Sequence, residues 1–192
     1  MRIPVILAPM GGIERWSVNG GLDVDDAAEE FGSVNFLSTV CQPSLEEVAA
    51  NSPHPKSFQI YVRGDDNWIR ELVRRVVRAN YSAVTLTVDS AFYGNRERLN
   101  PAQLALRRVP AREWQKKITW DTVKLIQDEI GERPLILKGI MTAEDAALAV
   151  EHGVQGIYIS NHGGRQLDHV LGNIQMLPEI VAATEGKAEI FI

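Results

Sequence analysis

Short apolar runs rich in β-branched residues alternate with amphipathic stretches along this chain, and this alternation limits the folds that it can adopt. Seven runs have the length and composition of buried strands: Pro4–Ala8, Val34–Ser38, Ser57–Val62, Ala83–Val88, Pro134–Leu137, Gly156–Ile159 and Ala188–Ile192. The stretches with helical periodicity are Asp25–Glu30, Leu45–Ala49, Trp68–Ala79, Trp120–Ile130, Ala143–His152 and Leu177–Ala183. Several of them begin near a candidate N-cap, namely Ser44, Asp66, Thr119 or Thr142. Strands that alternate with helices predict a parallel sheet.

Both doubly wound sheets and (β/α)8 barrels have this alternation. No Gly-x-Gly-x-x-Gly motif follows the first apolar run, which argues against a dinucleotide-binding sheet. The number of strand–helix units favours an α/β TIM barrel, incomplete because only about seven strands are present. A chain of 192 residues that is 45% hydrophobic can bury one core, so we expect a single domain over residues 1–192.

Composition excludes several classes of function. The net charge of −5 argues against nucleic acid as the main partner. No apolar run approaches the ~20 residues that a membrane span needs. The apolar start of the chain is interrupted by Pro4 and Pro9 and is too short for a signal peptide. Cys41 is the only cysteine and has no disulfide partner within the chain, so we expect a cytoplasmic protein.

The segment Ser160–Asp168 indicates a candidate active site. Ser160–Asp168 follows a buried strand and places His162 and Arg165 three residues apart on a turn with two glycines. A base and a carboxylate-binding group then project together from the carboxyl end of a strand. Active sites of α/β barrels lie at that end.

Polar side chains end the other predicted strands too. Thr85, Thr87 and Asp89 alternate and therefore share one face of their strand, and Gln59 and Tyr61 do the same one strand earlier. Lys138 follows the fifth apolar run. Together with the His162 segment they predict a ring of donors, acceptors and ionisable groups at one barrel mouth.

These segments resemble a known family. Ser160–Asp168 is similar to the active-site segment of the FMN-dependent α-hydroxy-acid oxidases and dehydrogenases, which include glycolate oxidase and lactate oxidase. Other segments resemble the same family in the same order: Ala8–Met10, Leu37–Thr39, Phe58–Tyr61, Leu86–Asp89, Gly94–Arg96 and Leu137–Ile140. The resemblance covers nearly the whole chain.

The resemblance implies an enzyme that uses FMN to oxidise a small L-2-hydroxy acid to the 2-oxo acid. It makes His162 the general base, with Asp89 and Tyr61 as the other catalytic residues. Tyr61, Arg96, His162 and Arg165 become the substrate contacts, with Arg165 as the carboxylate clamp. The implied flavin contacts are Pro9, Met10, Gly11, Ser38, Gln59, Thr87, Lys138 and Ser160.

The implied roles agree with the chemistry of the side chains. A neutral imidazole can accept a proton of the substrate at physiological pH, and a nearby carboxylate favours the imidazolium that forms. A planar guanidinium binds a carboxylate with two parallel hydrogen bonds, which a lysine cannot do. Lys138 would place its charge near the pyrimidine edge of the flavin, where negative charge accumulates on reduction. No group of residues has metal-ligand spacing, so we expect no metal site.

The chain departs from the family pattern in several places. Val40 stands where many members carry an aromatic residue, and the segment from Arg98 to Lys117 is shorter than the loop usual after the fourth strand. Family members also extend before Met1 and continue past Ile192 into the segments that bind the FMN phosphate. We therefore expect a chain truncated at both ends that binds FMN weakly by itself.

Two alternatives remain at this point. The first is another FMN barrel enzyme, such as a type 2 isopentenyl diphosphate isomerase, against which the set Arg96, His162 and Arg165 argues. The second is a catalytically silent or fragmentary barrel without flavin. The sequence leaves open which acid is oxidised, whether oxygen, a quinone or a cytochrome accepts the electrons, and whether the protein is a homo-oligomer.

Overall fold

Seven parallel strands form one curved sheet whose order follows the chain, from β1 to β7. The computed structural model describes residues 1–92 and 110–192. Its strands are β1 (Ile6–Leu7), β2 (Val34–Ser38), β3 (Lys56–Ile60), β4 (Ala83–Thr87), β5 (Leu135–Ile140), β6 (Gly156–Ile159) and β7 (Glu189–Phe191). Every predicted run therefore overlaps a strand, although β3 begins one residue before its run and β5 extends three residues past its run.

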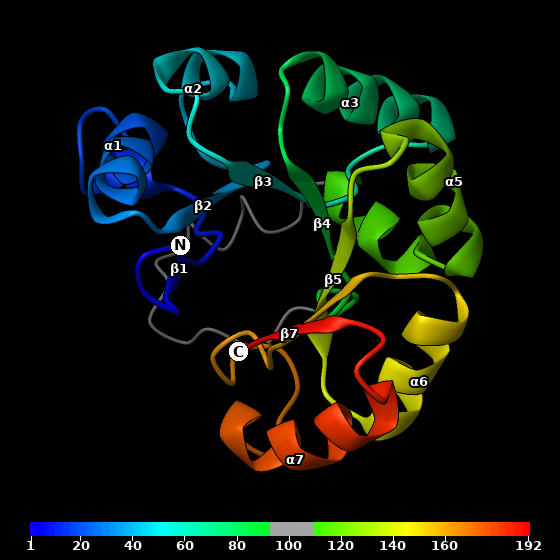
Figure 1. Cartoon of the computed structure of the whole chain (residues 1–192). Helices are drawn as coiled ribbons and strands as arrows, with labels where there is room; N and C mark the ends of the chain where they lie inside the picture. The colour runs from blue at the N-terminus through cyan, green and yellow to red at the C-terminus, as the bar shows by residue number, and fades with distance from the viewer. Residues whose placement is uncertain (93–109) are drawn as a thin grey trace.

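Helices follow the strands and cover the outer face of the sheet. They are α1 (Gly21–Phe31), α2 (Leu45–Asn51), α3 (Asp66–Arg78), α5 (Trp120–Ile130), α6 (Ala143–Glu151) and α7 (Asn173–Thr184), with 3-10 helices η1 (Ile13–Arg15) and η3 (Pro110–Lys117). Figure 1 shows them as an outer ring that is open between α1 and α7. The fold is an incomplete TIM barrel, as predicted, while the single-domain assignment stays a prediction.

Local capping explains where two of the helices begin. The Ser44 hydroxyl accepts a hydrogen bond from the Glu47 amide, and the Glu47 carboxylate accepts one from the Ser44 amide, so α2 starts with a capping box. The prediction that Asp66 caps α3 is wrong. Asp65 is the N-cap and accepts from the Trp68 amide, because it is the residue with extended backbone before the first turn.

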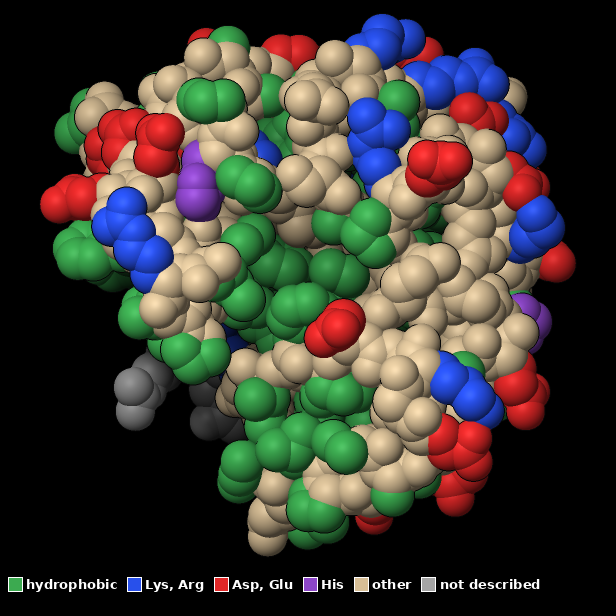
Figure 2. All heavy atoms as spheres, in the orientation of Figure 1, with side chains coloured by type: hydrophobic (Ala, Val, Ile, Leu, Met, Phe, Trp, Pro, Cys, Tyr) green, Lys and Arg blue, Asp and Glu red, His purple; other side chains and the backbone are tan. Residues whose placement is uncertain are grey.

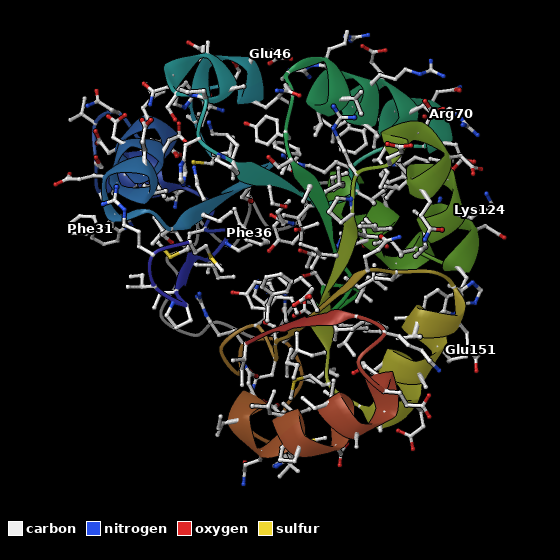
Figure 3. The ribbon with its side chains drawn as sticks, in the orientation of Figure 1. Phe31, Phe36, Glu46, Arg70, Lys124 and Glu151 are labelled. Carbon is white, nitrogen blue, oxygen red and sulfur yellow. The ribbon has the colours of Figure 1, made fainter. Side chains whose placement is uncertain are left out.

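The apolar core lies between the sheet and the helices. It is built from outward-facing strand residues such as Leu37, Ile60 and Leu86 and from inward-facing helix residues such as Val73 and Ile126. In contrast, Figure 3 places Arg70, Lys124 and Glu151 on the outer helices. Within the described residues, no helix is long and apolar enough to cross a bilayer.

A smaller cluster of apolar side chains fills the inside of the curve. Phe36, Tyr158 and Phe191 pack edge-to-face or tilted with ring centroids 5.9–6.2 Å apart, so they link β2, β6 and β7 across the interior. Figure 3 shows Phe36 inside the curve of the sheet, and Figure 2 shows hydrophobic side chains gathered in the hollow there. This apolar cluster lies inside the curve of the sheet, next to the polar residues at the carboxyl ends of the strands.

A buried ion pair joins β3 to α1 at the opposite end of the strands. The Lys56 ammonium lies 3.2 Å from a carboxylate oxygen of Asp25, and both side chains are at most 5% exposed. Lys56 also donates to the Ser52 carbonyl at 2.7 Å, and the Ser52 hydroxyl donates to Asp25 at 3.1 Å. The pairing and these hydrogen bonds offset the cost of removing the two charges from water.

We expect Lys56→Met to lower the free energy of unfolding by about 3–5 kcal/mol, because the Asp25 carboxylate would stay buried without its cation. The matched control is Lys124→Met, which breaks an exposed pair with Asp128 and should cost less than about 1 kcal/mol. Urea unfolding of both variants checks this expectation. Equal losses would show that the Lys56–Asp25 pair has no special role in stability.

Candidate active site

Polar side chains cover the inner face at the carboxyl ends of the strands. The Ser38 hydroxyl donates to the Gln59 side-chain carbonyl at 2.6 Å, and the Gln59 amide nitrogen donates to the Thr87 hydroxyl at 2.7 Å. All three side chains belong to residues that are at most 2% exposed. The hydrogen bonds join β2, β3 and β4 into one rigid polar surface, and they replace the water that these groups lose on burial.

Lys138 continues this surface on β5. Its ammonium donates to the Ser160 hydroxyl at 2.9 Å and lies 5.4 Å from the centre of the Tyr158 ring. Burial lowers the pKa of Lys138, and the nearby Asp89 carboxylate opposes that shift. Within the described residues Lys138 has no carboxylate within ion-pair distance, so its positive charge is not neutralised by an ion pair there.

The turn after β6 presents His162 to the same mouth. His162, Gly163 and Gly164 all have positive φ, at 58°, 69° and 68°, which explains why two glycines follow the histidine. The His162 amide donates to the Ser160 hydroxyl at 3.1 Å, and the Gly164 amide donates to the Asn161 carbonyl and side-chain oxygens, each at 3.0 Å. The imidazole therefore leaves the sheet at a fixed position.

His162 forms hydrogen bonds through both ring nitrogens. Its Nδ1 lies 3.0 Å from Oδ1 of Asp89, which follows β4. Its Nε2 lies 3.2 Å from the hydroxyl of Tyr61, which follows β3. The His162 and Asp89 side chains are 19% and 11% exposed, so the group is sheltered but open to a small molecule. The three predicted catalytic residues are thus brought together.

This arrangement suits proton transfer. A carboxylate at Nδ1 fixes the neutral tautomer with its proton on Nδ1, so the lone pair of Nε2 faces the mouth. The same carboxylate stabilises an imidazolium once Nε2 has accepted a proton. The second oxygen of Asp89 is buried and has no hydrogen-bond partner among the described residues, which strengthens its preference for a neighbouring positive charge.

Four other predicted site residues lie in the segment after β1 and on the turn after His162. Pro9, Met10 and Gly11 follow β1, and Met10 is 58% exposed. Arg165 is exposed on the turn after His162, and within residues 1–92 and 110–192 no hydrogen bond links it to the imidazole. Arg96 lies outside the described residues. The roles of these five residues stay predictions.

Two residues that support the site were not identified from the sequence. The Thr39 hydroxyl donates to the Gln59 carbonyl at 2.5 Å and accepts from the Tyr61 amide at 3.1 Å. The buried side chain of Gln115 contacts the backbone of β4 and of the segment after β3. Thr39 ends an apolar run and could have been recognised as another strand-end polar residue, whereas nothing in the sequence around Gln115 marks it.

A cavity of about 360 Å³ adjoins the acid–base group. Asp89 and Ser160 form part of its wall, and the remaining wall is largely apolar, with Met141, Leu167 and Met176 among its members. It gives the site apolar space beside the Asp89 carboxylate.

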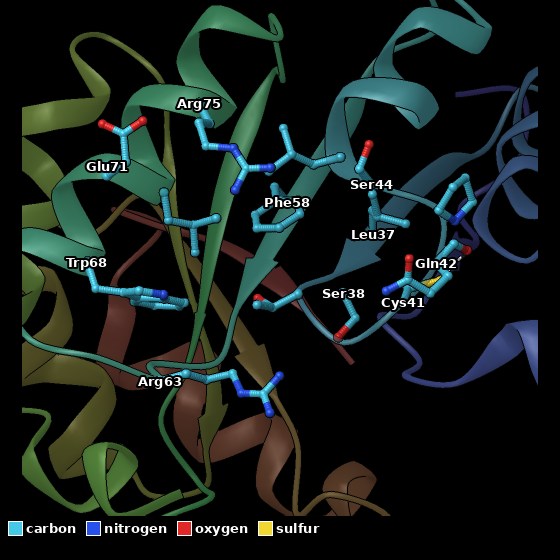
Figure 4. Close-up of a pocket in the computed structure, with 14 residues that line it drawn as sticks. Leu37, Ser38, Cys41, Gln42, Ser44, Phe58, Arg63, Trp68, Glu71 and Arg75 are labelled. Carbon is cyan, nitrogen blue, oxygen red and sulfur yellow. Dashed lines mark hydrogen bonds between the residues drawn. The ribbon is translucent and has the colours of Figure 1, made fainter. Parts of the chain in front are cut away.

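Another cavity has a volume of about 560 Å³. Figure 4 shows it against β2 and β3 and beneath α2 and α3, with Arg63, Trp68 and Arg75 on its wall. Ser38 is the one predicted site residue that lines it. Asp89, His162 and Tyr61 are not among the residues of its wall, whereas Ser38 belongs both to this wall and to the polar surface at the strand ends.

Comparison with known proteins supports a common ancestry. The sequence pattern of the family described as FMN-dependent dehydrogenase matches residues 1–192. An L-lactate oxidase from Nostoc sp. is 37% identical over 222 aligned residues, and glycolate oxidase from Spinacia oleracea is 34% identical over 215. A solved structure of mandelate oxidase superimposes with a TM-score of 0.86 at 33% sequence identity.

The matches span the chain but only part of each relative. They cover 100% of this chain and 60% of the lactate oxidase, 99% and 58% for the glycolate oxidase, and 98% and 57% for the mandelate oxidase. The chain thus spans somewhat more than half the length of these relatives. Because the family pattern matches throughout and the structure agrees, the chain belongs to the FMN-dependent dehydrogenase family.

Proposed function

We propose that the protein oxidises a small L-2-hydroxy acid to the 2-oxo acid with FMN as its cofactor. The observation that carries this proposal is the hydrogen-bonded group of Asp89, His162 and Tyr61 at the mouth of the half-barrel. Relatives named lactate, glycolate and mandelate oxidase support the same substrate class.

In this proposal His162 is the general base. Oxidation of a carbinol removes two protons, and Nε2 of the neutral imidazole is the ring nitrogen that faces the mouth. Asp89 holds Nδ1 at 3.0 Å and stabilises the imidazolium after proton transfer. The Tyr61 hydroxyl, 3.2 Å from Nε2, lies where it can bind the substrate oxygen that carries the proton.

The inner face fits FMN. Ser38, Gln59 and Thr87 offer donors and acceptors from three adjacent strands, and the buried Lys138 ammonium uses one of its three N–H groups on Ser160. A buried cation without an ion-pair partner in the described part of the chain suits the electron-rich edge of a ring. When bound, FMN would supply the acceptor for the two electrons of the substrate.

Arg165 and Arg96 are proposed to bind the substrate carboxylate. The exposed position of Arg165 on the turn after His162 leaves its guanidinium accessible to a ligand at the mouth. Planar guanidinium groups bind carboxylates with two parallel hydrogen bonds, which would orient the carbinol toward the imidazole.

Neither alternative function explains the site as well. An isomerase of isopentenyl diphosphate needs no carboxylate clamp, and the named relatives are oxidases. A silent barrel without flavin gives no reason for a buried ammonium beside a pre-formed acid–base group. The cytoplasmic location stays a prediction.

Gly139 makes room for the Asp89 carboxylate. It lies in β5 at an irregularity in the pairing with β6 and has a φ of 115°. A Cβ atom at this position would lie 2.6 Å from Cβ and 2.8 Å from Cγ of Asp89. Only a glycine accepts both this backbone angle and this close approach.

We expect His162→Ala to reduce turnover of L-lactate or glycolate about 10²–10⁴-fold, because the proton acceptor is lost. The flavin content of the purified variant should not change, since the imidazole acts on the substrate. Visible absorbance after gel filtration and steady-state rates measure the two effects. His169→Ala, an exposed histidine on the same loop, is the control. Loss of flavin in His162→Ala would assign the residue a structural role instead.

We expect Arg165→Lys to raise the KM about tenfold and to change kcat much less. The positive charge remains, but the two-pronged geometry is lost, and hydrogen bonds to charged groups contribute about 1.5–3 kcal/mol. Steady-state kinetics with the same hydroxy acids test this. An unchanged KM would contradict the clamp.

We expect Gly139→Ala to lower kcat at least tenfold, because the new methyl group displaces Asp89 from His162. The control is Gly131→Ala: Gly131 also has a positive φ, of 65°, but has nothing within 4 Å of the added Cβ. Backbone strain alone should therefore affect the control's stability and leave its kcat close to that of the wild type. Equal kcat values in the two variants would refute the displacement of Asp89.

A further inference from the structure

Gln115 is a buried polar residue whose side chain joins two strand ends at the mouth. It belongs to η3 and is 3% exposed. Its Oε1 accepts a hydrogen bond from the Val62 amide, and its Nε2 donates to the Thr87 carbonyl at 3.2 Å. One side chain thus satisfies a donor that follows β3 and an acceptor at the end of β4.

The position of this side chain coincides with the end of the β3–β4 ladder. The paired residues run from Ser57 opposite Ala83 to Ile60 opposite Leu86. Just beyond the last pair, the Gln115 amide lies between Val62 and Thr87, where it takes the place of a backbone peptide group. Its orientation is unambiguous, because exchange of oxygen and nitrogen would set donor against donor and acceptor against acceptor.

Both backbone groups lie close in sequence to acid–base residues. Val62 directly follows Tyr61, whose hydroxyl contacts His162. Thr87 is bound by Gln59 and precedes Asp89 by two residues. Gln115 therefore sets the separation between the chain segments that carry Tyr61 and Asp89.

The segment around Tyr61 is held from two sides. Thr39 accepts from the Tyr61 amide at 3.1 Å on the β2 side, and Gln115 accepts from the next amide on the β4 side. With one of these contacts removed, the segment can shift toward or away from the imidazole. Such a shift changes the alignment of the proton acceptor rather than the stability of the fold alone.

We propose that Gln115 is a positioning residue of the active site, which keeps Tyr61 and Asp89 at the spacing that His162 requires. The inference rests on the proposed function for its kinetic consequence only. The geometric consequence, a change in the hydrogen bonds of His162, does not depend on which reaction the protein catalyses.

Two variants of Gln115 separate the possible roles. Gln115→Met keeps the length of the side chain and removes both hydrogen bonds. Gln115→Glu keeps the acceptor for the Val62 amide and loses the donor to the Thr87 carbonyl. The control is Lys116→Met on the same 3-10 helix, which breaks an exposed pair with Glu113.

Steady-state kinetics of the flavin-loaded protein with L-lactate and glycolate give the first readout. We expect Gln115→Met to lower kcat at least tenfold with little change in KM, Gln115→Glu to retain an intermediate kcat, and Lys116→Met to match the wild type. A role in anchoring η3 alone predicts lower thermal stability with unchanged kcat for the folded fraction, and that result would overturn the proposal.

The second readout is the ring-nitrogen NMR signals of the histidines in the ¹⁵N-labelled protein, with His162 assigned from His162→Ala. We expect Gln115→Met to shift the His162 signals and to leave those of His54, His152 and His169 in place. If Gln115→Met does not fold, Gln115→Glu decides on the same criteria. Unmoved His162 signals would overturn the proposal. An inactive wild type with shifted His162 signals in the variant would refute the proposed function and support the positioning role.

Discussion

The in-register pairing of parallel strands is the constraint on which the site depends. Side chains alternate between the two faces of each strand, so one face supplies the core under the helices and the other faces the interior of the half-barrel. Phe36 and Ser38 share the inner face of β2, as Ile136 and Lys138 share that of β5. Apolar residues fill the lower level of the interior, and polar residues end at the mouth. A shift of one residue in the register of any strand would turn its core side chains toward the interior and its polar side chains toward the helices.

Burying the polar side chains at the strand ends costs free energy unless they form hydrogen bonds with one another. Ser38, Gln59 and Thr87 do so by direct hydrogen bonds, so they can hold fixed positions without water. Lys138 and Asp89 are less completely satisfied, because the ammonium has no ion-pair partner among the described residues and one carboxylate oxygen has no hydrogen bond there. The charges of Lys138 and Asp89 can therefore interact with a bound ligand. The hydrogen-bonded side chains around them hold these two groups in place.

Local patterns predicted the strands and the helices between them, and they marked Tyr61, Asp89 and His162 as polar residues at strand ends. Contacts between residues far apart in the sequence account for what was missed. The short apolar runs rich in β-branched residues located all seven strands, and the Gly-rich turn marked His162. In the structure, His162 and the two glycines after it have positive φ. Gln115 has no comparable pattern: its partners lie 28 and 53 residues away, so only the folded chain brings them together. Gly139 carried a weak signal, since a glycine within a strand indicates a bulge or a close approach, but the partner Asp89 could not be named from it.

Several different elements position the acid–base group of Tyr61, Asp89 and His162. Tyr61 follows β3, Asp89 follows β4 and His162 lies on the turn after β6. Gln115 of η3 joins the segments after β3 and β4. The glycine at 139 lets β5 approach Asp89 closely enough to fix it. Because each contact restrains a different coordinate of the same three side chains, the loss of one should misalign the group while the sheet persists. The alignment of Tyr61, Asp89 and His162 therefore depends on these few side-chain contacts. The free energy of unfolding depends mainly on the apolar core between the sheet and the helices.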